Sequence, residues 1–347
     1  MLREDPGLDE GAIAASLAAH YGLRIATIEY LPIGFDMRAA VYWTVAVDGV
    51  EYFLKIRFGP VFEPGLRVPR ALIDLGIPNI LGPLRTTAGE LWAPLERSDG
   101  HSIVLYPFIH GQSAKTVGLS AEQFRTFGET LWAVHASGLE QRFQDQLRVE
   151  DFALPSAAKA RRILTMVEND TTFESPAATQ LAAFWRENAG RIRQTLARAT
   201  ELGRALQDRS FSLVLCHADI HLTNVLVGAD GRIWLIDWDG PLIAPRERDL
   251  LFVVGSTIGR PVLPHEEDWF FAGYGPTEID PVALAYYRFE RKIEDLGEIA
   301  ESVFLDPGIS EAVRAAETEL VLRFFEPGGS IDRIESIPRR RWPDAAP

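Results

Sequence analysis

Apolar and polar positions alternate along residues 1–105 in the pattern that β-strands require. Short apolar runs are separated by turn signals at Pro32-Ile33-Gly34 and at Asp48-Gly49, and the second of these favours a β-hairpin. Two segments with helical spacing accompany them, residues 12–21 before Gly22 and residues 64–75 before Gly76. The strands predicted in this region are 25–31, 41–47, 52–56, 91–95 and 102–106.

Helical periodicity replaces this pattern further along the chain. Residues 111–118 form a polar connector, and Ser120 with Gln123 three positions later predicts a capped helix start. One β-rich island, 211–238, interrupts the helical region. The helices predicted here are 120–137, 157–168, 176–203, 280–304 and 310–325.

The length of 347 residues and this change of pattern predict two lobes of unequal size. The composition, 47% apolar and 24% charged, is that of a globular protein with a sizeable buried core. The fold class is therefore α+β and bilobal, with a small β-rich lobe over 1–105, a connector over 106–111 and a larger, mainly helical lobe over 112–347.

Charge and cysteine content exclude several functional classes. The formal net charge is −14, whereas a surface that binds nucleic acid is basic. The single cysteine, Cys216, excludes an intramolecular disulfide framework and fits a reducing compartment. The acidic N-terminus is unlike a secretory signal, and the apolar runs fall short of the roughly 18 residues of a membrane span. We expect a cytoplasmic protein, monomeric or weakly dimeric, that binds neither nucleic acid nor membrane.

The residues that can carry chemistry lie in the β-rich island. A polar loop precedes a hairpin of two short strands, 225–227 and 233–236. Because the hairpin returns the chain to its starting point, Asp219, Asn224 and Asp237 are predicted to converge. Oxygen ligands of this kind suit Mg²⁺, which completes its shell with phosphates and water.

The spacing of these three residues matches the machinery of phosphoryl transfer. The pattern H-x-D-x-x-x-x-N runs from His217 to Asn224, and Asp237 follows in a D-W-D segment. In phosphoryl-transfer enzymes the Asp of such a loop accepts the proton of the attacking hydroxyl, while the Asn and a later Asp hold metal. The sequence therefore predicts Asp219 as the catalytic base and Asn224 and Asp237 as metal ligands. The structural alternative is a polar loop whose side chains cap neighbouring backbone groups.

The other polar residues of this stretch have weaker claims to chemistry. We interpret His217 as bracing the loop and Cys216 as a small core residue. His221 is open between a contact to phosphate or substrate and a supporting hydrogen bond. Asp239 is open between orienting the metal site and capping the segment that follows.

Lysine is scarce in this chain, with four lysines against 31 arginines, which draws attention to Lys55. Lys55 lies among apolar residues of the predicted strand 52–56, where an unpaired charge is costly. We predict that it holds the α- and β-phosphates of a nucleotide, with Glu63 as the candidate ion-pair partner. The alternative is an edge-strand lysine that discourages aggregation, and Arg57 on the same strand face keeps that alternative open.

Two further segments are candidates for nucleotide contacts. The turn between the first two strands would cover the phosphates, so Gly34 and Asp36 are candidate nucleotide-binding residues, and Arg38 would touch the nucleotide or point to solvent. The connector contains Tyr106 and Phe108, and its backbone groups are candidates for pairing with an adenine edge. The alternative for the connector is a plain strand exit.

With these residues in place, the chain resembles the aminoglycoside phosphotransferase family, small-molecule kinases with a protein-kinase-like fold. The resemblance rests on Lys55, the connector, CHADIHLTNVLV, IDWD and PRERDL. It implies phosphorylation of a hydroxyl with ATP and Mg²⁺ as cofactors, Asp219 as the base, and Asn224 and Asp237 as metal ligands. Ala218 departs from the family, whose members commonly have Gly there.

Later segments indicate what the acceptor would be. IAPRERDL at 243–250, GYG at 273–275 and YYRFERKIEDL at 286–296 resemble a subgroup that acts on aminocyclitols. The implied acceptor is an aminoglycoside or aminocyclitol antibiotic such as spectinomycin, and the acidic net charge favours a cationic acceptor. The alternative is a salt-bridged helix surface in which Arg291 pairs with Asp295. The candidate acceptor-binding residues are Asp249, Tyr287, Arg291 and Glu294.

Two other functions stay open. A metabolic kinase for an amino alcohol, a sugar or a nucleoside-like molecule would use the same core residues, because the phosphoryl machinery does not set the acceptor. An inactive kinase-like binding module would have lost the lysine, the base or a metal ligand. This chain has all of them.

Overall fold

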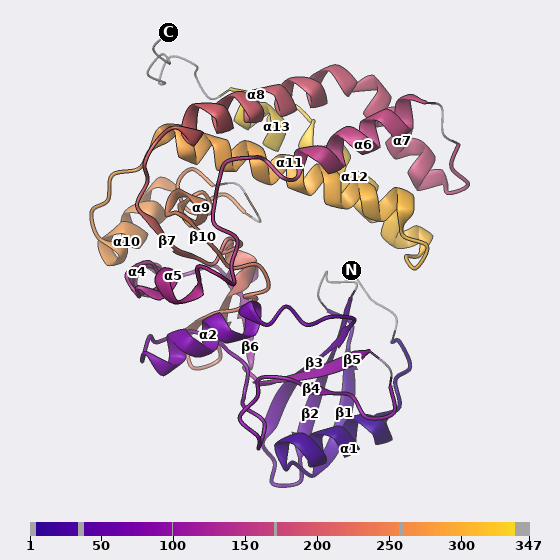
Figure 1. The fold of residues 1–347 in the computed structure, drawn as a ribbon, viewed down its shortest axis with the longest axis vertical. Helices are drawn as coiled ribbons and strands as arrows, with labels where there is room; N and C mark the ends of the chain where they lie inside the picture. The colour runs from indigo at the N-terminus through magenta and orange to yellow at the C-terminus, as the bar shows by residue number, and fades with distance from the viewer. Residues whose placement is uncertain are drawn as a thin grey trace. The chain divides into compact units, whose positions relative to one another are not determined.

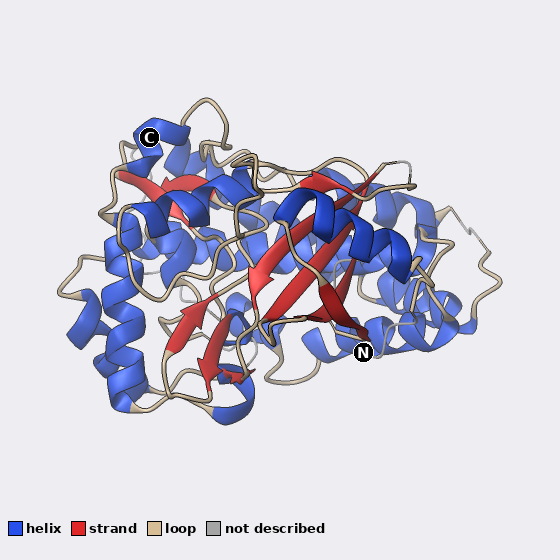
Figure 2. Cartoon of the chain, turned by 90° about the horizontal axis from the view of Figure 1, so that it is seen from below, coloured by secondary structure: helices blue, strands red, loops and turns tan. Residues whose placement is uncertain are grey.

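The computed structural model describes residues 5–33, 38–98, 100–169, 172–256, 258 and 260–336. A β-sheet region at the N-terminal end is followed by a mainly helical region (Figure 1; Figure 2, strands in red), so the predicted α+β class is confirmed. The chain divides into two compact units. Unit 1 comprises Met1–Arg148, Val214–Ile243 and Phe252–Pro276, and unit 2 comprises Val149–Leu213, Ala244–Leu251 and Thr277–Pro347.

A five-stranded antiparallel sheet opens unit 1, with the strand order β1-β2-β3-β5-β4. Lys55 lies in the middle of β3, opposite Val41 on one side and Val104 on the other. It is therefore on a central strand, and the edge-strand interpretation is wrong. The strands are β1 Ile25–Leu31, β2 Ala39–Ala46, β3 Glu51–Phe58, β4 Ala93–Pro94 and β5 His101–Pro107.

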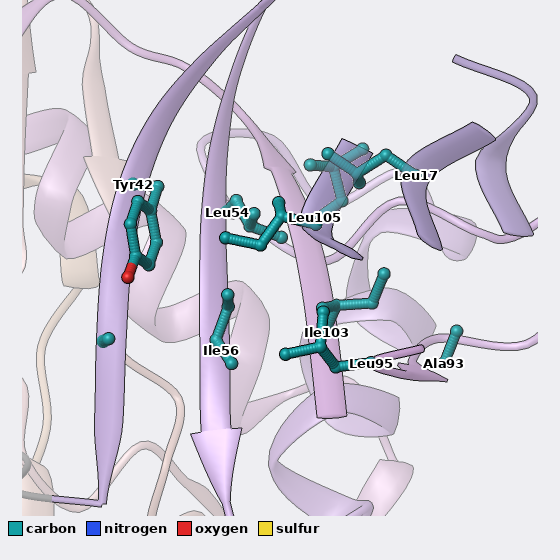
Figure 3. Close-up of a cluster of buried hydrophobic side chains, with 10 residues drawn as sticks. Leu17, Tyr42, Leu54, Ile56, Ala93, Leu95, Ile103 and Leu105 are labelled. Atoms are coloured by element: carbon teal, nitrogen blue, oxygen red, sulfur yellow. The ribbon is translucent and has the colours of Figure 1, made fainter. Parts of the chain in front are cut away.

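Helix α1 (Glu10–Tyr21) packs on one face of this sheet. Asp9 caps its first turn, and Gly22 ends it in the left-handed conformation at φ 68°. Leu17 reaches the sheet beside Leu54 and Leu105, as Figure 3 shows, in a cluster of fully buried side chains. Because side chains alternate along a strand, Lys55 points to the opposite face, away from this core.

The polar segment 111–118 contains more regular structure than predicted. Residues Gly111–Ser113 form strand β6, which pairs with β8 (Val225–Gly228), and β9 (Ile233–Leu235) completes a three-stranded sheet. Gly111 is required at this crossing, because a Cβ there would lie 2.3 Å from the carbonyl oxygen of Val227. Residues 108–110 thus link the end of β5 in the five-stranded sheet to the three-stranded sheet that contains β8 and β9.

Short elements surround this hairpin in unit 1. Helix α4 begins with the predicted capping box of Ser120 and Gln123. Helix α10 packs against α4, and strand β7 leads into the loop that contains Asp219. The remaining elements of this part are α2 Pro64–Asp74, α3 Ala114–Val117, α4 Ala121–His135, α5 Leu139–Phe143, β7 Leu213–Cys216, η1 Leu222–Asn224, β10 Leu242–Pro245, which pairs with β7, and α10 Pro264–Tyr274.

Unit 2 is built around the long helix α11, which packs against α6, α8 and α12 (Figure 1). The single helix predicted over 176–203 is wrong, because the chain breaks into two helices at Asn188. The Asn188 side chain bonds back to the carbonyl of Phe184, a local alternative to helix continuation. None of the helices in the described ranges is long and apolar enough to cross a membrane. The helices are α6 Ala157–Glu168, α7 Pro176–Glu187, α8 Ala189–Gln207, α9 Glu247–Leu250, α11 Pro281–Leu305, α12 Glu311–Phe324 and α13 Ser330–Glu335.

Candidate active site

The loop between β7 and β8 is held by hydrogen bonds between its own residues. The Asn224 side-chain amide donates to the backbone oxygen of Asp219 at 2.8 Å and lies 3.4 Å from its carboxylate Oδ2. This use of Nδ2 leaves Oδ1 as the Asn224 atom that can hold a metal ion. Ala218 adopts a left-handed backbone at φ 72°, a conformation that favours glycine.

His217 braces the loop, as predicted. Its ring is fully buried, and its Nδ1 accepts a hydrogen bond from the Asp219 amide at 3.3 Å. Its Nε2 lies 2.9 Å from the carbonyl of Ile236 and must therefore carry the proton. The Trp238 ring packs 4.3 Å from the imidazole, so His217 links the loop to the end of the hairpin.

Asp237 lies beside the start of the hairpin, because the Ile236 amide donates to the carbonyl of Asn224 at 3.0 Å. The backbone of the hairpin therefore returns beside Asn224, as expected, and the Asp219 charge acts on Asp237, while the roles of the three residues stay a prediction. Burial, followed by the negative charge of Asp239, raises the pKa of the Asp237 carboxyl, and Lys55 opposes this only in part. Its backbone is left-handed at φ 66°, a conformation that aspartate tolerates better than most residues.

Lys55 and Arg57 both bind Asp239. The Lys55 Nζ lies 2.6 Å and the Arg57 Nη1 3.2 Å from the same carboxylate oxygen, Oδ2. Burial alone would raise the pKa of Asp239, but the two cations outweigh it and hold the pKa below its ordinary value. Asp239 is thus an ion-pair residue of this site rather than a cap of the segment that follows.

The expected ion pair between Lys55 and Glu63 is wrong in this structure. Glu63 stands before the first turn of α2 and pairs with Arg67 at 2.6 Å, one turn along the same helix. Sequence reasoning missed the actual partner because Asp239 follows Lys55 by 184 residues. A signal was present in the D-W-D segment, which contains a second acid, Asp239, two residues after Asp237.

His221 contacts the predicted base directly. Its Nε2 lies 3.6 Å from the Asp219 Oδ1, and its ring packs against Phe252. This geometry favours the supporting role over a contact to phosphate. The ring restricts the rotation of the Asp219 carboxylate.

The remaining candidate nucleotide-binding residues are Gly34, Asp36, Tyr106 and Phe108. Gly34 and Asp36 lie outside the described residues. Tyr106 packs its ring 6.2 Å from Phe53, and burial raises its pKa, so its hydroxyl stays neutral. The Phe108 amide donates to the carbonyl of Glu51 at 3.3 Å, so this group extends the sheet instead of facing an adenine edge.

The four acceptor candidates all lie in unit 2. Asp249 and Tyr287 are fully buried, whereas 37% of the Glu294 side chain is exposed. The Arg291 Nε binds the Asp295 Oδ1 at 3.0 Å, so the salt-bridge alternative for this helix is confirmed. Among the four, Glu294 keeps the most accessible charge.

These features define a class. A lysine on a central strand of a small sheet and an H-x-D-x-x-x-x-N loop followed by D-W-D on a hairpin are the marks of a protein-kinase-like phosphotransferase. The chain belongs to the phosphotransferase enzyme family, whose pattern matches residues 29–289. The resemblance to aminoglycoside phosphotransferases is thereby confirmed, and the protein is an enzyme of this family.

Solved structures agree with this assignment. The chain is similar to spectinomycin phosphotransferase APH(9)-Ia in complex with ADP and spectinomycin, with a TM-score of 0.84 and 29% identity over 96% of this chain and 99% of that chain. It is also similar to amicoumacin kinase hAmiN in complex with AMP-PNP, Ca²⁺ and Ami, with a TM-score of 0.61 and 19% identity over 94% and 93% of the two chains. Macrolide 2′-phosphotransferase MphH from Brachybacterium faecium gives a TM-score of 0.53 and 21% identity over 89% and 97%. The last two likenesses concern the fold alone.

Proposed function

We propose that this protein transfers the γ-phosphoryl group of ATP to a hydroxyl of a small cationic molecule, an aminocyclitol such as spectinomycin, and thereby confers antibiotic resistance. The observation that carries the chemistry is the Asp219 loop, in which Asn224 and His217 form hydrogen bonds with Asp219 and the His221 Nε2 lies 3.6 Å from its carboxylate. The acceptor assignment rests on the 29% identity with spectinomycin phosphotransferase over nearly the whole chain.

Asp219 acts as the base. Its carboxylate takes the proton of the acceptor hydroxyl as that oxygen attacks the γ-phosphorus, the bond between the γ-phosphorus and the bridging oxygen breaks, and ADP leaves. His221 and Asn224 restrict the carboxylate to the orientation that faces the hydroxyl. Lys55 binds the α- and β-phosphates.

The donor set fits Mg²⁺. The Asn224 Oδ1 and the Asp237 carboxylate are hard oxygen atoms of the kind that Mg²⁺ prefers. Burial, followed by the charge of Asp239, raises the pKa of Asp237, and a bound divalent cation would lower it. When bound, the metal ion would neutralise charge on the transferring phosphates.

The candidate residues for recognition of the acceptor lie in unit 2. Glu294 supplies the most accessible carboxylate for an ammonium group, whereas Arg291 is paired with Asp295 and both Tyr287 and Asp249 are buried. The lobe boundaries at residues 105 and 111, the cytoplasmic location and the monomeric or weakly dimeric state remain predictions.

The test is ADP release from ATP and Mg²⁺ with a panel of aminocyclitols, aminoglycosides, macrolides and simple amino alcohols. Spectinomycin is expected to give the highest kcat/KM, and its product should gain the mass of one phosphoryl group. A higher kcat/KM with an amino alcohol would indicate a metabolic acceptor instead of an antibiotic. The proposed mechanism of phosphoryl transfer would be unaffected by that result.

A further inference from the structure

We propose that Asp239 is the residue that positions Lys55 for the nucleotide phosphates, and that Arg57 acts through Asp239 to hold it there. The inference rests on the proposed function, because it names the carboxylate partner of the phosphate-binding lysine. It gives Arg57 and Asp239 tasks that the phosphoryl-transfer pattern alone does not assign.

The geometry of the three side chains supports this assignment. Lys55 and Arg57 are two residues apart on β3 and therefore point to the same face of the sheet. Both cations meet one oxygen of Asp239, and their side chains are only 14% and 17% exposed. An ammonium group has three N–H donors, so Lys55 can hold Asp239 with one and still offer two to phosphate oxygens.

Helix α2 packs against the segment of Asp239, but in the described structure it supplies no charged partner to Lys55. The carboxylate of Glu63 is paired with Arg67 within the helix. Gly65 instead lies against the D-W-D segment, where an added Cβ would come within 2.9 Å of the Trp238 carbonyl oxygen and 3.5 Å of the Asp239 Cα. The start of α2 therefore supports the backbone of Asp239, and Lys55 takes its carboxylate from that segment.

Asp239 is distinguished from the predicted metal ligand by its surroundings. Asp237 is two residues earlier and lies next to Asn224, whereas Asp239 faces the cations of β3. A bound phosphate that occupies Lys55 still leaves Arg57 on Asp239. The carboxylate therefore stays in place during nucleotide binding and is not displaced by it.

The test measures ADP binding by calorimetry in the presence of Mg²⁺ for Asp239→Asn, Arg57→Gln, the double variant and Glu63→Gln. A hydrogen bond between charged groups is worth enough for Asp239→Asn to raise the Kd of ADP about tenfold and for Arg57→Gln to raise it about threefold. Because Arg57 acts through Asp239, the double variant should bind ADP as Asp239→Asn does. Asp74→Asn is the matched control, because Asp74 also binds two arginines, Arg70 and Arg85, and is 47% exposed. It should change the Kd by less than about twofold.

Several results would overturn the proposal. Unchanged ADP binding by Asp239→Asn would mean that Asp239 does not contribute to nucleotide binding. Tighter binding would mean that Asp239 competes with the phosphates for Lys55. A larger loss in Glu63→Gln than in Asp239→Asn would restore Glu63 as the partner. Additive effects of the two substitutions on the Kd of ADP would mean that Arg57 does not act through Asp239. If Asp239→Asn fails to fold, Arg57→Gln decides alone, since normal ADP binding by that variant contradicts the proposal.

A magnesium titration separates positioning from metal binding. The Mg²⁺ concentration for half-maximal ADP release should rise in Asp237→Asn and stay at the wild-type value in Asp239→Asn. An equal rise in both would make Asp239 a metal ligand and overturn the inference. Wild-type protein that binds no ADP would refute the proposed function itself, whereas wild-type binding that ignores Asp239 would refute only this inference.

Discussion

In unit 1 two aspartates, Asp237 and Asp239, follow the β8–β9 hairpin, whereas in unit 2 helix α11 places its acids beside bases. The pKa of Asp237 is raised, because burial and the charge of Asp239 both disfavour its ionised form. The pKa of Asp295 is lowered although burial opposes ionisation, because Lys292 at 2.5 Å and Arg291 at 3.0 Å stabilise the carboxylate. The two buried aspartates, Asp237 and Asp295, thus have opposite pKa shifts.

This difference distinguishes a cluster that is a candidate for binding or catalysis from one that stabilises helix packing. A cluster that concentrates like charge is costly for the folded protein and is retained where a cation or a proton has to be handled. A cluster whose charges alternate stabilises the packing of helices. The sequence showed both clusters as acidic and basic residues at close spacing, and only the structure distinguishes them.

The largest expected effect is on turnover. Asp219→Asn should lower kcat by about 10²–10⁴-fold, because it removes the base while leaving the phosphate-binding residues in place. ADP should still raise the Tm of the variant. Asp230→Asn, in the turn of the same hairpin, is the control and should keep wild-type turnover. Wild-type kcat in Asp219→Asn would refute the base assignment.

Next comes the stability of unit 2. Arg248 is buried and lies 3.2 Å from the buried Glu290. Arg248→Met should lower the free energy of unfolding by about 3–5 kcal/mol, because it leaves a buried carboxylate without its cation. Urea denaturation measures the change. Adding Glu290→Met should restore part of the loss, and a further loss instead would contradict the electrostatic explanation.

The pH dependence of α11 is a smaller effect. Because the pKa of Asp295 is lower in the folded state than its ordinary 3.8, its stabilising contribution is complete above that pH and is lost as the pH falls below it. Asp295→Asn should cost about 1 kcal/mol at pH 7, and this difference from wild type should shrink below pH 3.8. Urea unfolding at pH 7, 5 and 3 measures it. If the difference in the free energy of unfolding between wild type and Asp295→Asn stays constant over this range, the ion pairs of Asp295 are not its cause.

The smallest expected effect is at Ala218, the left-handed residue of the catalytic loop. Ala218→Gly should raise the free energy of unfolding by about 0.5–1 kcal/mol, because glycine adopts φ 72° without a Cβ clash. Ala315→Gly, on the exposed face of α12, should lower it by about 1 kcal/mol. Thermal unfolding of both variants checks the opposite signs, and equal signs would show that backbone strain is absent at Ala218.

The sequence predicted what depends on neighbouring residues. The bounds of β1 at 25–31 and of α6 at 157–168 were predicted correctly. The Asp219–Asn224 contact was also predicted, because it spans five residues. The pairing of β6 with β8 and the Lys55–Asp239 ion pair were missed, because both depend on partners more than a hundred residues away, which no local pattern encodes.

The pairing of Gly111 with Gly228 also has a consequence for how the protein is made. During synthesis the five-stranded sheet and β6 leave the ribosome first, and the helices α6, α7 and α8 of unit 2 emerge before β8. A nascent or prematurely terminated chain that ends just before residue 225 therefore contains β6 and the loop of Asp219, but it lacks the β8–β9 hairpin and with it Asp237 and Asp239. A truncated product of this kind would lack the predicted metal ligand Asp237 however well its first half has folded.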